Sequence, residues 1–143
     1  MKKGYLAAAF AVCIILLSSC GSNPGQTETS NVPAAPSKPT GDVIYKRSCV
    51  SCHQSNGEGL PNVYPPLAKS DFITDKEKTI GQVIKGYTGE MVVNGKKYNS
   101  TMPAQQLNDD EVAAVLTYVY SNFGNGGTSV TAGEVTAARA KLQ

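Results

Sequence analysis

The segment Cys49-Val50-Ser51-Cys52-His53 decides how this sequence folds, because it follows the pattern C-x-x-C-H. Two thiols three residues apart can reach the two vinyl groups on one side of a porphyrin, and the histidine that follows then lies beneath the iron. Cys49 and Cys52 are therefore predicted to hold one haem c by covalent thioether bonds, with His53 as the proximal iron ligand.

Two other chemistries share parts of this pattern. A zinc site could use both cysteines and the histidine, but neighbouring Cys and His residues are poorly placed around one tetrahedral ion, and the chain has no second histidine. A thioredoxin-like redox pair would need a β-α-β context, which the surrounding sequence lacks. Covalent haem is the interpretation that uses the whole pattern.

The sixth position of the iron has several possible occupants. His53 is the only histidine, so a second histidine ligand is excluded, and Met, Lys, Tyr, Asn, water or no ligand remain. Outside the N-terminal segment the methionines are Met91 and Met102. Met102 precedes Pro103, which keeps the chain extended there and lets the thioether project across a haem face. Met91 begins an alternating strand, where packing is the usual role. Met102 is the predicted distal iron ligand.

A first helix is predicted to include the motif. The spacing i, i+4, i+8, i+11 brings both cysteines to one side of it and is that of Gly41, Tyr45, Cys49 and Cys52. A second helix is predicted to begin at a capping box of Thr74 and Glu77 and to end where Gly86 and Gly89 lie. Its apolar stripe has the spacing i, i+3, i+4, i+7 and consists of Ile80, Val83, Ile84 and Tyr87.

The second half of the chain contains a hairpin signal and two further capping patterns. Asn94-Gly95 predicts a tight turn between two short strands. Asn108 and Glu111 form a capping box that opens the most regular helix of the sequence, and Thr131 and Glu134 predict a short helix in the tail. A hairpin this short does not build a sheet, so the domain is expected to be all-α, with three to four helices.

The N-terminus has the features of an export signal. Two lysines precede a 13-residue apolar stretch, which is too short to span a bilayer. The stretch ends in Leu17-Ser18-Ser19-Cys20, which resembles a bacterial lipobox. An ordinary secretory signal with an incidental cysteine is the alternative. The predicted organisation is a signal peptide at 1–19, lipidated Cys20 with a proline-rich tether at 20–40, a folded domain at 41–124 and a C-terminal extension at 125–143.

Charge excludes one class of function. Without Lys2 and Lys3, which belong to the predicted signal, the chain has eleven basic and eleven acidic side chains. A nearly neutral chain without a basic run argues against a nucleic-acid partner.

These motifs together resemble class I monohaem cytochromes c, over about residues 41–124. The hairpin that leads into Met102-Pro103 is most similar to the cytochrome domains fused to copper nitrite reductases and haem–copper oxidases. The resemblance implies that Gly41 and Tyr45 pack against Val115 and Tyr118 where the first and last helices cross. It also implies that the carbonyl of Pro65 or Pro66 accepts a hydrogen bond from His53, and that Asn99 either donates to the methionine sulfur or is a turn residue.

The expected function is single-electron transfer by a membrane-tethered monomer on the periplasmic side or outer surface, with no catalytic residue. Expected partners are redox proteins, such as a terminal oxidase or nitrite reductase and a quinol-oxidising complex. One alternative is a haem-based sensor, or an enzyme acting on peroxide or nitric oxide, in which Met102 is displaced. Another is a haem subunit fixed in a respiratory complex.

Overall fold

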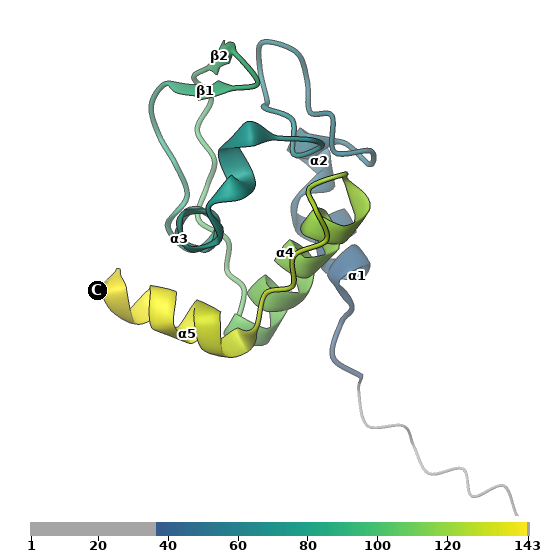
Figure 1. Ribbon diagram of the computed structural model, residues 1–143, viewed down its shortest axis with the longest axis vertical. Coiled ribbons are helices and arrows are strands. Elements are labelled where there is room, and N and C mark those ends of the chain that lie inside the picture. The colour runs from purple at the N-terminus through teal and green to yellow at the C-terminus, as the bar shows by residue number, and fades with distance from the viewer. Residues whose placement is uncertain (1–36, 143) are drawn as a thin grey trace, which may run out of the picture. The chain divides into compact units, whose positions relative to one another are not determined.

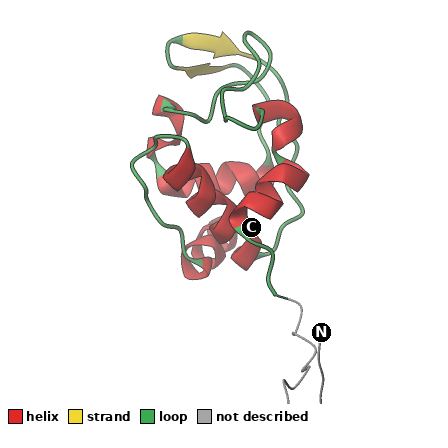
Figure 2. Cartoon of the chain, turned by 90° about the vertical axis from the view of Figure 1, so that its right-hand side faces the viewer, coloured by secondary structure: helices red, strands yellow, loops and turns green. Residues whose placement is uncertain are grey.

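The computed structural model describes residues 37–142, which form five α-helices, one 3-10 helix and one two-stranded hairpin. The α-helices are α1 (Gly41–Ser48), α2 (Val50–His53), α3 (Lys76–Lys85), α4 (Asp109–Asn122) and α5 (Ala132–Lys141). The 3-10 helix η1 (Asp71–Thr74) precedes α3, and the hairpin consists of β1 (Met91–Val93) and β2 (Lys96–Tyr98). Figures 1 and 2 show the helices gathered together, with the hairpin at one end of them. The described part of the chain is therefore mainly helical, as predicted.

Several N-terminal predictions lie outside the described residues. They are the signal peptide at 1–19, lipidation of Cys20 and most of the tether at 20–40. Within residues 37–142, none of the helices has the length and apolar character needed to cross a membrane.

The helix that carries the two cysteines is broken, which accounts for one of the additional helices. Cys49 has φ −121° and ψ −32°, so α1 ends there and α2 begins after it. The N–H groups of Cys52 and His53 both point to the Cys49 carbonyl, at 3.2 and 2.9 Å. A single tightened turn therefore separates the two halves of the predicted helix.

The N-terminus of α3 differs from the prediction. The residue that caps it is Asp75, whose carboxylate accepts the Lys78 N–H at 3.0 Å. Thr74 instead donates its hydroxyl to the Asp71 carbonyl at 3.1 Å, within η1. The predicted capping box of Thr74 and Glu77 is therefore wrong. The carboxylate of Asp75 caps the helix and also interacts favourably with its N-terminal dipole.

The other local predictions are confirmed. Asn94 and Gly95 have φ 49° and 75°, and Val93 pairs with Lys96, so these two residues alone form the hairpin turn. Asn108 with Glu111 and Thr131 with Glu134 form complete capping boxes at α4 and α5. Gly86 ends α3 with φ 76°.

The crossing of α1 and α4 forms the centre of the core. Gly41 lies so close to α4 that a Cβ atom there would be 2.2 Å from the Ala114 carbonyl oxygen and 2.7 Å from Tyr118 Cβ. Tyr45, which is 1% exposed, packs its ring against Tyr118 and Phe123, with centroid separations of 5.5 and 5.1 Å. The predicted packing of Gly41 and Tyr45 against Tyr118 is confirmed, and the backbone that Gly41 approaches is that of Ala114 rather than Val115.

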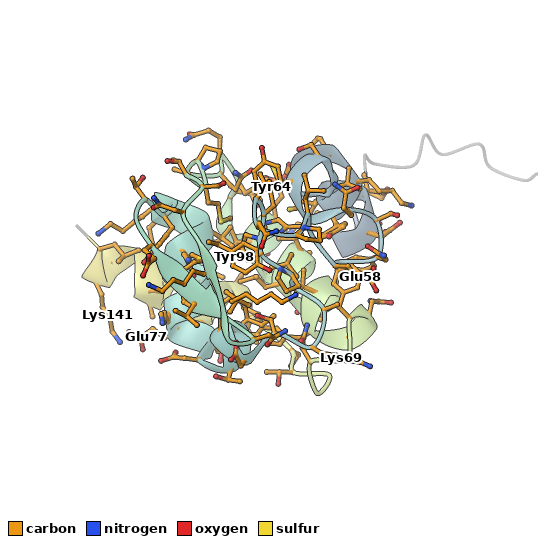
Figure 3. All side chains as sticks on the ribbon, turned by 90° about the horizontal axis from the view of Figure 1, so that it is seen from above. Glu58, Tyr64, Lys69, Glu77, Tyr98 and Lys141 are labelled. Carbon is orange, nitrogen blue, oxygen red and sulfur yellow. The ribbon has the colours of Figure 1, made fainter. Side chains whose placement is uncertain are left out.

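Helix α5 packs against both α3 and α4. Val135, a residue of α5, is fully buried in this contact. Arg139 Nε donates to Asp109 at 2.9 Å, and its guanidinium also donates to the Leu107 carbonyl at 3.1 Å. Lys141 pairs with Glu77 of α3 at 2.8 Å, at the edge of the molecule seen in Figure 3. The C-terminal extension is therefore packed onto the rest of the domain and also fixes the segment just before α4.

Replacing Gly41 by alanine is expected to lower the free energy of unfolding by about 2 to 3 kcal/mol, because the added methyl group would overlap α4 backbone. Gly81→Ala is the matched control. A Cβ at Gly81, in the middle of α3, meets nothing closer than Leu142 methyl groups at 4.0 Å. It should raise the stability by about 0.5 to 1 kcal/mol. Urea unfolding of both variants measures the two effects, and equal stabilities would contradict the close crossing.

Candidate cofactor site

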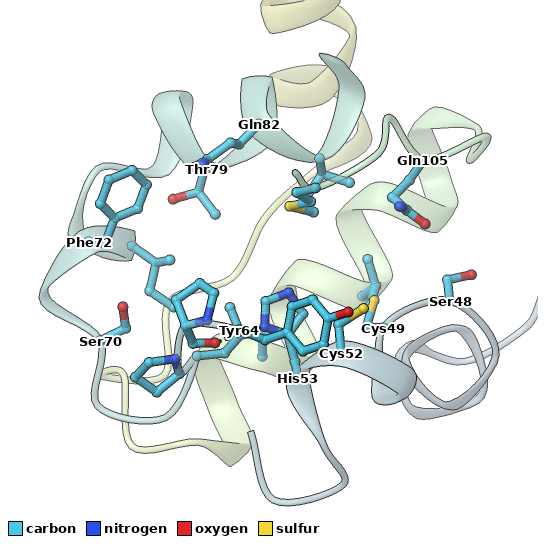
Figure 4. Close-up of a pocket in the computed structure, with 18 of the residues that line it drawn as sticks. Ser48, Cys49, Cys52, His53, Tyr64, Ser70, Phe72, Thr79, Gln82 and Gln105 are labelled. Carbon is cyan, nitrogen blue, oxygen red and sulfur yellow. Dashed lines mark hydrogen bonds between the residues drawn. The ribbon is translucent and has the colours of Figure 1, made fainter. Parts of the chain in front are cut away.

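A cavity of about 180 Å³ lies between α2, α3, α4, the hairpin and the loops that join them. Packing voids in small domains are far smaller than this, so the cavity is large enough to hold a ligand. Its walls are mostly apolar, and among the described residues that line it none is Lys, Arg, Asp or Glu. Figure 4 shows side chains from several elements converging on it.

Both cysteines of the motif line this cavity, together at one end of it in Figure 4. Burial, with a smaller contribution from Cys52, raises the pKa of Cys49 to about 11. Before a thioether bond forms, the Cys49 thiol is therefore protonated at neutral pH. Both thiols therefore belong to the same cavity.

His53 is 9% exposed and also lines the cavity. Its Nδ1 lies 3.0 Å from the carbonyl oxygen of Pro65, and Nδ1–H donates to this oxygen, so Nε2 keeps its lone pair. Desolvation lowers the pKa of His53, although the hydrogen bond to Pro65 opposes this in part. The imidazole is therefore held neutral, which is the form that binds metals.

Gly59 makes the contact between His53 and Pro65 possible. Its φ is +67°, and a Cβ there would lie 2.4 Å from the Tyr64 carbonyl oxygen and 2.6 Å from that of Pro65. Its N–H donates to the His53 carbonyl at 3.0 Å. The sequence does not distinguish Pro65 from Pro66 as the acceptor, and in the structure Pro65 accepts.

Met102 lines the cavity from the segment between the hairpin and α4. Its backbone exchanges two hydrogen bonds of 2.8 Å with Tyr87. Gly86 allows this approach, because a Cβ there would lie 2.5 Å from the Met102 carbonyl oxygen. Met91 of β1 lines the same cavity, so the structure brings both candidate methionines to it. Asn99 directly follows β2, is exposed and is not among the lining residues.

Some lining residues were not identified from the sequence. Ser70, Tyr64 and Gln82 belong to three different segments, and no local pattern marks them as neighbours. Ser70 follows a run of loop residues, where a serine is ordinary. Only the packing of these segments around one cavity shows that they share a site.

Comparison with known proteins agrees with this arrangement. The family model described as Cytochrome c matches residues 40–122. The chain is 38% identical to cytochrome c-552 of Thermus thermophilus over 112 residues, which cover 71% of this chain and 85% of the relative. It is 31% identical to cytochrome c-551 of Bacillus subtilis, covering 82% and 94% of the two chains.

A further relative is the fructose dehydrogenase cytochrome subunit of Gluconobacter japonicus, 29% identical over 70% of this chain but only 22% of the relative. The family match covers more than half of the chain, and the relative from Thermus thermophilus aligns over most of its own length. The cavity lined by the C-x-x-C-H motif agrees with the covalently attached haem c of these proteins. This chain therefore belongs to the cytochrome c family, as a class I monohaem member with covalently attached haem c.

Proposed function

We propose that this cytochrome is a one-electron carrier in which Cys49 and Cys52 hold the haem and His53 and Met102 ligate its iron. The observation that carries the proposal is that these four side chains, from two distant segments, line one uncharged cavity. The bound haem supplies an iron centre that gains and loses single electrons.

The residues around the cavity fit such a group. The two thiols lie together at one end, as two thioether bonds require, and the neutral imidazole of His53 is oriented by Pro65. The apolar walls exclude water and favour the less charged, reduced form of the iron. A methionine sulfur ligand favours the reduced form as well, so the reduction potential is raised.

The surroundings of the cavity argue against catalysis on a small molecule. A sensor or peroxide enzyme would need a donor group beside the open iron position, such as a second histidine or an arginine. His53 is the only histidine of the chain. Arg47 pairs with Glu111 at 3.0 Å and Arg139 with Asp109 at 2.9 Å, and neither arginine lines the cavity.

A spectroelectrochemical titration tests the carrier against the sensor or enzyme. The purified holoprotein is expected to give one reversible one-electron transition and a low-spin spectrum in both oxidation states. The folded reduced protein should bind carbon monoxide slowly or not at all, because the methionine occupies the sixth position. A high-spin protein that binds carbon monoxide readily would favour the sensor or enzyme instead.

The membrane tether is part of the proposal and rests on the lipobox-like Leu17-Ser18-Ser19-Cys20. The protein is proposed to be exported, cut before Cys20 and held by lipid on the periplasmic side of a membrane or at the outer surface. A Cys20→Ser variant should then lack the lipid and move to the soluble periplasmic fraction, if it is still exported and processed. Mass spectrometry of the mature N-terminus is decisive, and an unmodified first residue other than Cys20 would refute the tether.

The partners are proposed to be redox proteins. The pattern of the hairpin and the Met102 segment supports an oxidase or nitrite reductase as acceptor and a quinol-oxidising complex as donor. A second candidate is a haem subunit fixed in a larger complex, supported by similarity to cytochrome subunits named for fructose and gluconate dehydrogenases. Helix α5, which lies beyond the family match at residue 122, offers additional surface for such an assembly.

A further inference from the structure

Ser70 carries an unexplained polar atom. Its Oγ is the one buried side-chain oxygen or nitrogen without a hydrogen-bond partner among residues 37–142. The residue is 6% exposed and lines the haem cavity. In Figure 4 its hydroxyl lies at the end of the cavity opposite the labelled Cys49 and Cys52. A buried hydroxyl without a partner is unfavourable, so a group bound in the cavity is the natural partner.

The chain around Ser70 is fixed so that this hydroxyl stays free. Ser70 occupies the N-cap position of η1, where a serine usually accepts a backbone N–H, but its side chain makes no such bond. The N–H of Ser70 donates to Asn125 at 3.1 Å, and the N–H of Asp71 donates to Asn94 at 3.0 Å. Two asparagines from distant loops therefore replace the cap and hold the backbone in place.

The chemistry of haem supplies a matching acceptor. Its two propionate groups lie on the edge of the porphyrin opposite the two vinyl groups. If Cys49 and Cys52 take the vinyl groups, the propionates face the end of the cavity where Ser70 lies. We propose that the Ser70 hydroxyl donates a hydrogen bond to a haem propionate. This inference rests on the proposed thioether role of the two cysteines.

Other groups near Ser70 are engaged elsewhere. The hydroxyl of Thr79, which also lines the cavity, already donates to the Asp75 carbonyl at 2.7 Å. Lys78 lies over the Phe72 ring, with Nζ 4.0 Å from its centroid, and the Asp71 carboxylate accepts the Asn94 N–H at 2.7 Å. Lys69 does not line the cavity. With no charged side chain in the lining, a neutral donor such as the Ser70 hydroxyl becomes important for a buried carboxylate.

A Ser70→Ala variant of the holoprotein tests the assignment. In the NMR spectrum of the reduced wild type, the side chain of Ser70 should show contacts to propionate methylene protons. In Ser70→Ala the midpoint potential should shift downward, because a propionate charge that loses its donor stabilises the oxidised iron. Ser70→Thr should restore the potential, since it keeps the hydroxyl and the extended backbone at this position (φ −86°, ψ 122°) suits a β-branched residue.

Ser48→Ala is the matched control, because it removes a hydroxyl at the cysteine end of the cavity and should leave the propionate contacts unchanged. The assignment is wrong if Ser70→Ala keeps the wild-type potential, or if the Ser70 side chain shows no contact to a propionate. A spectrum of the denatured protein reports separately whether haem is attached by thioethers. Failure of the Ser70 assignment can therefore be distinguished from failure of the proposed function.

Discussion

A double variant, Cys49→Ala with Cys52→Ala, is expected to lose all covalently bound haem and most of its folded structure. Helices α2, α3 and α4 surround the cavity, and several of their apolar side chains line it. Haem contributes the apolar surface that these side chains bury, so its loss removes part of the hydrophobic stabilisation of a small domain. Acid–organic extraction and circular dichroism measure the two effects.

The wild type should retain its haem through denaturation and extraction. Ser51→Ala is the matched control, because Ser51 lies between the two cysteines and is exposed. It should keep the haem fully attached and the helical signal intact. Free extraction of haem from the denatured wild type would show that no thioether bonds exist, and the cysteine assignment would be wrong.

Met102→Ala is expected to produce the largest change in the iron chemistry. The weak sulfur-to-iron charge-transfer band of the oxidised protein in the far red should disappear, and the midpoint potential should fall because a soft ligand is lost. The open position should then bind carbon monoxide or cyanide rapidly and give some peroxidase activity. Absorption spectra, redox titration and ligand-binding kinetics provide the measurements.

Met91→Ala is a stringent control, since Met91 lines the same cavity as Met102. It should leave the far-red band, the potential and the slow ligand binding nearly unchanged. If Met91→Ala removes the band and Met102→Ala retains it, the two methionine assignments are inverted, although the electron carrier remains. The backbone of each methionine is held by pairing, Met102 with Tyr87 and Met91 with Tyr98.

The features that the sequence predicts correctly are those whose cause lies within a few residues. The Asn94-Gly95 turn follows from two positive φ angles, and the capping boxes at Asn108 and Thr131 join groups three residues apart. The C-x-x-C-H motif is likewise local. Met102 could be proposed because a single histidine and few methionines leave little choice.

The sequence does not predict which residue caps a helix or accepts a hydrogen bond where the choice depends on contacts between separate segments. Thr74 and Asp75 are both good caps, and the bond from Thr74 to Asp71 within η1 leaves Asp75 to cap α3. Between Pro65 and Pro66, the choice depends on the loop that Gly59 allows to approach His53. These outcomes depend on contacts that the local pattern does not contain.

The cofactor and the helical class follow from the sequence alone, because covalent attachment of haem requires two cysteines and a histidine at fixed spacing. The sequence also predicts Cys49, Cys52, His53 and Met102 as the residues that hold the haem. Tertiary structure alone decided that α5 fixes the segment before α4 through Arg139, that Met91 shares the cavity with Met102, and that Ser70 presents a free hydroxyl to it. The physical reason is that burial and hydrogen-bond satisfaction depend on segments brought together only when the chain folds.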